Sequence, residues 1–343
     1  MQNSPYTVSA PLNRLTQAGI PTMSVVICTR NREDQVPAAI ESVLANQHSN
    51  FELIVVDQST NDVTEKTIQP FIPDPRFKYI HSNTTGQGIS RNIGLKCARA
   101  DIVVFTDDDC TVSTHWLNAV EDVFRKYPRV SVVFCSVDPG PHDRKQGAIP
   151  YRHYAKDKIY RSVTQYFNTA GMGAGMSVRK SAILKWGGFD ETLGPGAYFR
   201  SADDIDVAWR ALLKHEWVYE LSSETVIHHG FRNWVEYKEL TKRDFYSIGA
   251  VHAKLAKRSF FQALPTILYH TFYVSLWVQV AGVLFYRQGE SSTRLLDYWL
   301  DVVKRPRGFT RFIYYWWGFF KGMQTPVDYS NLVYLYHSDD QKN

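Results

Sequence analysis

Cysteine is scarce in this sequence, and its placement argues against two kinds of small scaffold. The 343 residues include four cysteines, which stand far apart and form no CxxC pair. Neither a disulfide framework nor a structural zinc site fits that spacing. A signal-peptide pattern is also missing, because no basic start leads into an apolar run near the N-terminus. We therefore expect the catalytic part to work in a reducing, cytosolic setting.

Net charge is absent from the first two thirds of the chain and concentrated in the rest. Residues 1–235 hold 25 Lys and Arg against 25 Asp and Glu, whereas residues 236–343 hold 14 against 9. The basic stretch is rich in aromatic residues, which predicts contact with an anionic membrane surface. Nucleic acid ranks lower as a partner, because no nucleic-acid-binding module is recognisable. We expect a polar lead-in over 1–22, a catalytic domain over 23–235 and a helical, membrane-associating appendage over 236–343.

Short apolar runs alternate with helical patterns in the catalytic region. This alternation predicts an α/β fold with a mostly parallel sheet and helices on both faces. Ligands of such sheets bind beyond the carboxyl ends of the strands. Thr29, Asp57 and the run Asp107-Asp108-Asp109 follow strand ends directly, so they are candidate site residues on placement alone. The runs that indicate strands are 24–28, 51–56, 77–80, 102–106 and 130–134.

Three consecutive carboxylates after an apolar strand repel one another unless a cation or a helix N-terminus offsets their charge. One interpretation is helix capping by Asp109, with the other two solvated. The other is a Mg²⁺ or Mn²⁺ site, since these ions bridge carboxylates to substrate phosphates. Strand alternation would then turn Asp107 and Asp109 to one side and Asp108 to the other. A dehydrogenase fits poorly, because Arg91 stands where the third glycine of a dinucleotide-binding loop is required.

A second acidic cluster, Asp203, Asp204 and Asp206, stands at the start of an amphipathic pattern. We expect a helix to begin near Asp204. One acid suffices to cap it, so three suggest a catalytic carboxylate as well.

Further along, His228 and His229 follow a strand-like run over 225–227. Either could ligate Mn²⁺, and alternation along a strand lets only one of them face the site.

Taken in their order along the chain, these motifs resemble those of the family-2 glycosyltransferases, which have the GT-A fold. The ordered set spans about residues 23–232 and is specific, although each motif alone is weak. The residues that carry the resemblance are Val25–Arg32, Leu53–Asp57, Gly88–Gly94, Val104–Asp109, Gly187–Glu191, Asp203–Asp206 and His228-His229.

The resemblance implies an inverting, metal-dependent transferase that uses a nucleotide-diphospho-sugar, with a UDP-sugar favoured, in polysaccharide or lipid-linked glycan assembly. It implies that Asp204 is the general base and Asp203 its partner, where the family has Glu. It implies Mn²⁺ or Mg²⁺ on Asp109, with Asp107, His228 and His229 as further candidates. The donor-binding residues it implies are Thr29, Arg30, Asn31, Asp57, Arg91, Asp107 and Asp108.

Two other functions remain open at this stage. A sugar-nucleotide pyrophosphorylase has a related fold, but a glycine-rich basic loop would follow its first strand, and Thr29–Glu33 has no glycine. A membrane-bound protein that binds nucleotide-sugars or glycans without turnover would not need Asp204.

Residues 262–286 contain no Asp, Glu, Lys or Arg. The stretch is long enough to span a bilayer, yet only moderately apolar, so an interfacial or buried helix fits as well. The aromatic cluster 314–317 lies between Arg311 and Lys321, a pattern that suits lipid headgroups. We therefore expect attachment at the inner face of the cell membrane, either peripheral or anchored.

Overall fold

A mixed, ten-stranded sheet forms the centre of the molecule in a computed structural model that describes residues 6–8, 19–167, 171–272 and 308–335. The strand order is β1-β4-β3-β2-β5-β10-β7-β11-β6, and β9 pairs with β11. The strands are β1 (Tyr6–Val8), β2 (Met23–Thr29), β3 (Phe51–Asp57), β4 (Phe77–Ser82), β5 (Ile102–Asp107), β6 (Cys110–Thr111), β7 (Val130–Pro139), β9 (Lys158–Tyr160), β10 (Met176–Arg179) and β11 (Trp217–His228).

The strands expected from the apolar runs are all present, and four of them form the parallel block β4-β3-β2-β5. In this block Thr29 stands opposite Asp57, and Cys28 stands opposite Asp107. The carboxyl ends therefore meet at one edge, as a parallel sheet requires. The short strand β10 was not expected; it runs antiparallel between β5 and β7 and makes the sheet mixed.

Helices cover both faces of the sheet, which explains why the central strands are apolar throughout. Along β2 and β3, alternate residues enter two different buried clusters. One cluster includes side chains of α1 and α4, and the other includes side chains of α3, α5 and α6. The helices are α1 (Val36–Leu44), α2 (Val63–Thr67), α3 (Gln87–Cys97), α4 (Trp116–Lys126), α5 (Lys180–Lys185) and α6 (Asp203–Leu213).

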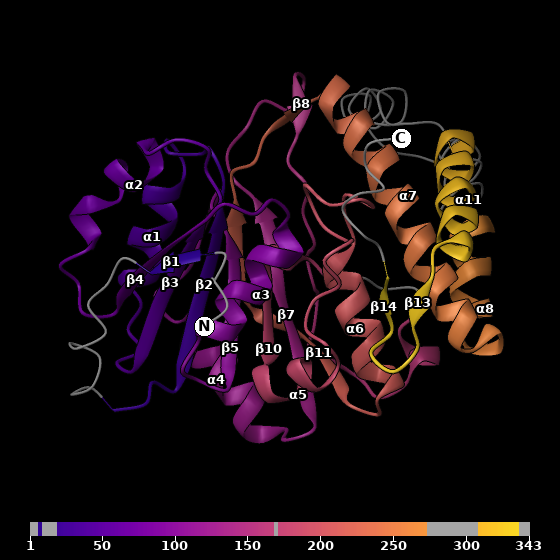
Figure 1. Ribbon diagram of the computed structural model, residues 1–343, viewed down its shortest axis with the longest axis horizontal. Helices are drawn as coiled ribbons and strands as arrows, with labels where there is room; N and C mark the ends of the chain where they lie inside the picture. Colours follow the sequence, from indigo (N-terminus) through magenta and orange to yellow (C-terminus); the bar gives the residue numbers. More distant parts are fainter. Residues whose placement is uncertain (1–5, 9–18, 168–170, 273–307, 336–343) are drawn as a thin grey trace, which may run out of the picture.

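The C-terminal helices α7 (Trp234–Arg258), α8 (Phe260–Leu268) and α11 (Gly308–Gln324) stand together at the opposite end of the molecule from α1 and α2 (Figure 1). An Asn233–Glu236 capping box starts α7. The backbones of α7 and α11 approach closely: a Cβ on Gly318 would lie 1.8 Å from the carbonyl oxygen of Tyr246. Only glycine fits there.

The described part of the expected appendage packs on the rest of the chain. Val251 of α7 and Phe319 of α11 belong to the same buried cluster as residues of the central sheet. The small ribbon β13 (Val327–Asp328) and β14 (Val333–Tyr334) joins this cluster too. A second ribbon pairs β8 (Gly147–Ala148) with β12 (Arg232–Asn233), directly before α7.

None of the helices in the described ranges is both long enough and apolar enough to cross a membrane. Of the uncharged stretch 262–286, residues 273–286 lie outside those ranges. Most of the polar lead-in 1–22 does as well.

Candidate functional site

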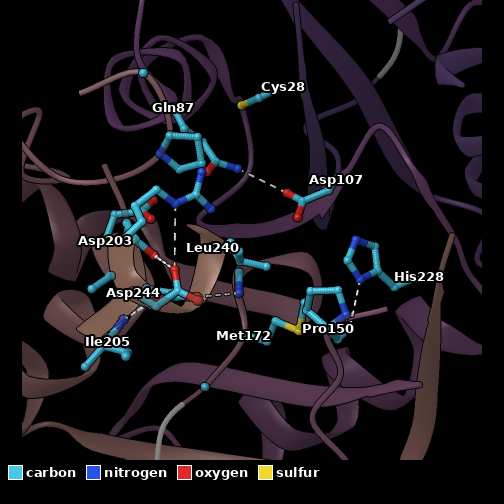
Figure 2. A pocket seen from close by; sticks show the side chains of 18 of the residues that line it. Cys28, Gln87, Asp107, Pro150, Met172, Asp203, Ile205, His228, Leu240 and Asp244 are labelled. Atoms are coloured by element: carbon cyan, nitrogen blue, oxygen red, sulfur yellow. Dashed lines mark hydrogen bonds and ion pairs between the residues drawn. The ribbon is translucent and has the colours of Figure 1, made fainter. Parts of the chain in front are cut away.

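A cavity of about 800 Å³ lies at the carboxyl ends of the parallel strands and extends to the C-terminal helices. Nine of the twelve predicted site residues line it. Figure 2 shows Asp107 and His228 on one side of the cavity, and Asp203, Ile205 and Asp244 on the other. The nine are Thr29, Arg30, Arg91, Asp107, Asp108, Asp109, Asp203, Asp204 and His228.

The other three predicted residues do not line the cavity. Asp57 is fully buried, and its oxygens accept hydrogen bonds from the Ser59 amide and the Tyr79 hydroxyl, each 2.8 Å long. The Asn31 side chain accepts a bond from the Thr60 amide. His229 is exposed and lies 3.0 Å from the Thr111 hydroxyl. His228, the last residue of β11, is buried and lines the cavity, so we carry only His228 forward as a metal ligand.

The acidic triplet is held from two directions. Gln87 at the start of α3 donates to Asp107 at 3.1 Å. Arg32 donates to both Asp108, at 2.8 Å, and Asp109, at 2.7 Å. Our expectation that Asp108 turns away was wrong, because β5 ends at Asp107 and the next two residues form a turn, in which strand alternation no longer applies.

The three carboxyl groups have different protonation tendencies. Burial raises the pKa of Asp107, and it raises that of Asp108 to about 6 although Arg32 opposes the shift. Burial acts on Asp109 as well, but the hydrogen bonds and positive charges of His228 and Arg32 outweigh it and hold the pKa well below its usual range. Asp109 is therefore the member most firmly ionised at neutral pH.

A metal-binding arrangement forms where β6 pairs with β11. Ligand atoms of Asp109, Cys110 and His228 all lie within 4.8 Å of one another. The His228 Nδ1 is 2.8 Å from the carbonyl oxygen of Pro150, an atom that can only accept, so Nδ1 carries the proton. The Nε2 then faces Asp109 at 3.3 Å. A carboxylate and an imidazole oriented this way are donor groups that suit a divalent metal ion such as Mn²⁺.

On the opposite wall, a strained turn presents the second acidic cluster. Arg200 and Ala202 both have left-handed backbones, with φ of 64° and 67°, directly before α6. Asp204 accepts a 2.7 Å hydrogen bond from the Gly173 amide on one oxygen and another from the Ile205 amide on the other. Burial, together with the charge of Asp203, raises the pKa of Asp204 to about 7, against the lowering effect of Arg91.

Arg91 connects the two walls. Its guanidinium forms an ion pair with Asp203 and lies 3.6 Å from Asp107. The rings of Phe105 and Phe189 each stand 5.8 Å from the guanidinium carbon. This side chain therefore neutralises carboxylates of both clusters while being almost fully buried.

Comparison with known proteins relates the sequence and the fold to a known family. Residues 24–187 match the model of glycosyl transferase family 2. This match, over slightly less than half of the chain, places the region 24–187 in that family. It is 26% identical over 216 residues to the glucosyl-dolichyl phosphate glucuronosyltransferase of Haloferax volcanii, covering 60% of this chain and 66% of that one. An uncharacterized glycosyltransferase of Rickettsia felis is 39% identical over 88 residues, which cover 25% of this chain and 14% of that one.

Solved structures show the same GT-A fold. A mannosyltransferase of Pyrobaculum calidifontis, in complex with GDP-Man and Mn²⁺, has a TM-score of 0.60 at 16% identity, with 87% of both chains covered. S. aureus TarS 1–349 has a TM-score of 0.57 at 15% identity, covering 88% of this chain and 90% of that one. The expected fold is thus confirmed. The chain spans only 66% and 14% of the two curated relatives named above.

Several residues that line the cavity escaped the sequence analysis. Gln58 and Arg32 line the donor side; Arg32 ends the motif Val25–Arg32 but was given no role there, and Gln58 lies just after the motif Leu53–Asp57. Cys110 lies beside the metal candidates. Leu240 and Asp244 of α7 reach the cavity from a segment that we expected to serve only membrane contact.

The third acid of the second cluster has a structural role. Asp206 forms ion pairs with Lys254 at 2.6 Å and with Arg210 at 2.7 Å. Lys254 is fully buried and also reaches Asp190 at 2.6 Å. The one lysine of the stretch 250–255, whose other residues are apolar apart from His252, was the available signal for this network. The network ties α7 to the helix that carries Asp204.

Proposed function

We propose that this chain is a metal-dependent, inverting glycosyltransferase. Its donor would be a nucleotide-diphospho-sugar of the UDP type, and its acceptor a glycan or lipid-linked glycan. One observation carries the proposal: Asp109, His228 and Asp204 all line a single cavity. The Haloferax volcanii relative is named for a lipid-linked substrate, and TarS has been solved with UDP-GlcNAc. Both support a reaction of this class.

The residues divide the chemistry between the two walls. Asp204 accepts the proton of the acceptor hydroxyl as this oxygen attacks the anomeric carbon. The bond between that carbon and the diphosphate oxygen breaks, and attack from the opposite face inverts the centre. Asp109 and His228 would hold the divalent metal, which offsets the negative charge that develops on the leaving diphosphate.

The raised pKa of Asp204 suits a base that works near neutral pH. Asp203 does not share this role, because its carboxylate is engaged by Arg91. We assign Asp203 to positioning: it fixes Arg91, which in turn lies near Asp107 on the donor side. The shorter Asp, in place of the family's Glu, still reaches that arginine.

We further propose that the C-terminal helices contact an anionic membrane surface on the cytoplasmic side. Phe260 and Phe261 of α8 are 54% and 85% exposed, next to Lys257 and Arg258. On α11, Trp317 is 58% exposed. Exposed aromatic rings beside basic residues suit the headgroup region of a bilayer. This placement would bring the cavity close to a lipid-linked acceptor.

A panel of nucleotide-sugars tests the proposed activity. Each is incubated with the full chain, with and without Mn²⁺, and release of nucleoside diphosphate is followed. We expect release from one or a few uridine nucleotide-sugars, and loss of release in chelator. Release that does not depend on a divalent metal would contradict the metal assignment, and release from no nucleotide-sugar would contradict the function.

A further inference from the structure

One carboxyl group of the cavity comes from outside the two acidic clusters. Among the described residues, six carboxyl groups line the cavity, and five of them belong to those clusters. The sixth is Asp244 of α7. It shares a face of this helix with Leu240 and Ile248, which stand four residues before and after it and also line the cavity. A carboxylate between two apolar side chains needs a specific partner.

The contacts of Asp244 within the chain engage only one of its two oxygens. Its Oδ1 accepts a 2.7 Å hydrogen bond from the hydroxyl of Ser201. The Nε of Arg243 lies 3.8 Å from the same oxygen, which makes an ion pair without a hydrogen bond. Within the described parts of the chain, Oδ2 has no hydrogen-bond partner, and the side chain is 37% exposed. This second oxygen is therefore available to a ligand in the cavity.

The bond to Ser201 places Asp244 on the same side of the cavity as the base. Ser201 belongs to the turn before α6 and precedes Asp204 by three residues. In Figure 2, Asp244 lies beside Asp203, across the cavity from Asp107. A carboxylate at this place would repel the diphosphate of the donor. A ligand of Asp244 is therefore the acceptor, whose hydroxyl must reach Asp204.

Aromatic rings accompany Asp244 in the cavity lining. Phe245 follows it on α7, and the ring of Phe245 lies 6.5 Å from that of His270, measured between ring centres. The ring of Tyr269 lies 5.5 Å from that of His270, and all three residues line the cavity. A sugar has hydroxyl groups around the edge of its ring and C–H groups on its faces. A carboxylate among aromatic rings suits both parts of such a ligand.

We propose that Asp244 is an acceptor-binding residue, which holds a second hydroxyl of the acceptor sugar while Asp204 activates the first. This inference rests on the proposed function, because it takes Asp204 as the base. The Oδ2 of Asp244 accepts the second hydroxyl in a charge-assisted hydrogen bond, and the bond from Ser201 fixes the carboxylate relative to the turn that leads to the base. The acceptor must then be a sugar with at least two free hydroxyl groups, and α7 takes part in selecting it.

Competition between water and simple sugars tests the proposal. The full chain is incubated with Mn²⁺, its preferred nucleotide-sugar and the methyl glycosides of glucose, galactose and mannose, and the products of transfer and of hydrolysis are quantified. Both products form on the same folded molecules, so their ratio does not depend on how much protein is active. Hydrolysis by the wild type reports on the proposed function alone. Transfer to none of the glycosides while hydrolysis proceeds would overturn the inference and leave that function standing.

Substitutions on α7 then assign the effect to Asp244. Asp244→Asn still accepts the bond from Ser201 but lacks the charge, so the ratio of transfer to hydrolysis should fall about fivefold or more. Asp244→Ala removes the acceptor atom altogether and should lower the ratio about tenfold or more. The matched control is Glu239→Gln, at an exposed position of the same helix, which should leave the ratio unchanged. An unchanged ratio in both Asp244 variants would overturn the proposal, since a purely structural role would lower both products together.

Monodeoxy analogues of the best glycoside identify the hydroxyl that Asp244 holds. The analogue without the attacked hydroxyl gives no transfer product with any form of the protein. With the wild type, one further analogue should lower the ratio of transfer to hydrolysis about tenfold or more, because it leaves the carboxylate without its partner. With Asp244→Ala the same analogue should lower the ratio less than about twofold, since the partner is already gone. Equal decreases in both proteins would overturn the assignment to Asp244.

Discussion

The substitution Asp204→Asn separates a catalytic base from a helix-capping residue. It keeps the size and shape of the side chain but removes its capacity to accept a proton. Removing a general base lowers a rate by about 10²–10⁴-fold, equivalent to about 3–5 kcal/mol in the activation free energy. A mere cap predicts almost no loss, since Asn caps a helix about as well as Asp.

The structure also predicts what this substitution does to stability. Asp204 accepts one hydrogen bond on each oxygen, from Gly173 and Ile205. An amide can keep one of these and must give up the other, at a cost of about 1 kcal/mol. Its neutral side chain also relieves repulsion with Asp203, which partly offsets that cost. We therefore expect a melting temperature within a few degrees of wild type.

The assay combines three measurements: the transfer rate, the donor dissociation constant and the melting temperature. The rate should fall at least a hundredfold while donor affinity barely changes, because the neighbours of Asp204 in sequence, Asp203 and Ile205, lie across the cavity from Asp107 and His228 in Figure 2. The variant Asp122→Asn, at an exposed position on α4, is the matched control. A rate for Asp204→Asn within threefold of wild type would refute the assignment.

Four further outcomes are expected. Burial raises the pKa of Asp204 to about 7, and only the ionised carboxylate accepts a proton. We therefore expect kcat/KM to decrease as the pH falls below about 7. A flat pH profile from 5 to 8 would count against this base. Asp109→Ala should abolish Mn²⁺-dependent donor binding in calorimetry with little change in fold, whereas unchanged binding would remove Asp109 from the metal site. Lys254→Met should lower the free energy of unfolding by about 3–5 kcal/mol, measured with denaturant, because it leaves two buried carboxylates without their shared cation. A decrease of less than about 1 kcal/mol would contradict this role. The double substitution Phe260→Ser/Phe261→Ser should reduce co-sedimentation with anionic vesicles severalfold without changing donor binding. If the variant sediments with the vesicles as well as wild type does, the membrane contact lies elsewhere.

The parallel half of the fold and most of the site were predictable from local patterns. Strand ends of a parallel sheet share one edge, so acids directly after apolar runs, such as Asp109, had to lie near one another. The α6 helix begins at Asp203, one residue before the expected position. The four-residue strand β10 was missed because its run is too short to distinguish from a loop.

The remaining features depend on contacts between distant parts of the chain. Lys254 stands on α7, far along the chain from Asp206, so nothing near Asp206 indicated that it faces this buried cation. Which histidine faces the cavity depended on the register of β11, which the pattern over 225–227 left open. The contribution of α7 and α11 to the cavity follows from their close packing at Gly249 and Gly318. Charge patterning alone had suggested a surface role for these two helices.

The central claim is a single displacement in which Asp204 activates the attacking oxygen. Water can replace the acceptor, so slow hydrolysis of the preferred nucleotide-sugar reports the stereochemistry without a known acceptor. Proton NMR, recorded before mutarotation equilibrates the released sugar, identifies the anomer formed first. With an α-linked donor we predict the β anomer, together with its disappearance in Asp204→Asn. Initial release of the α anomer would contradict the account.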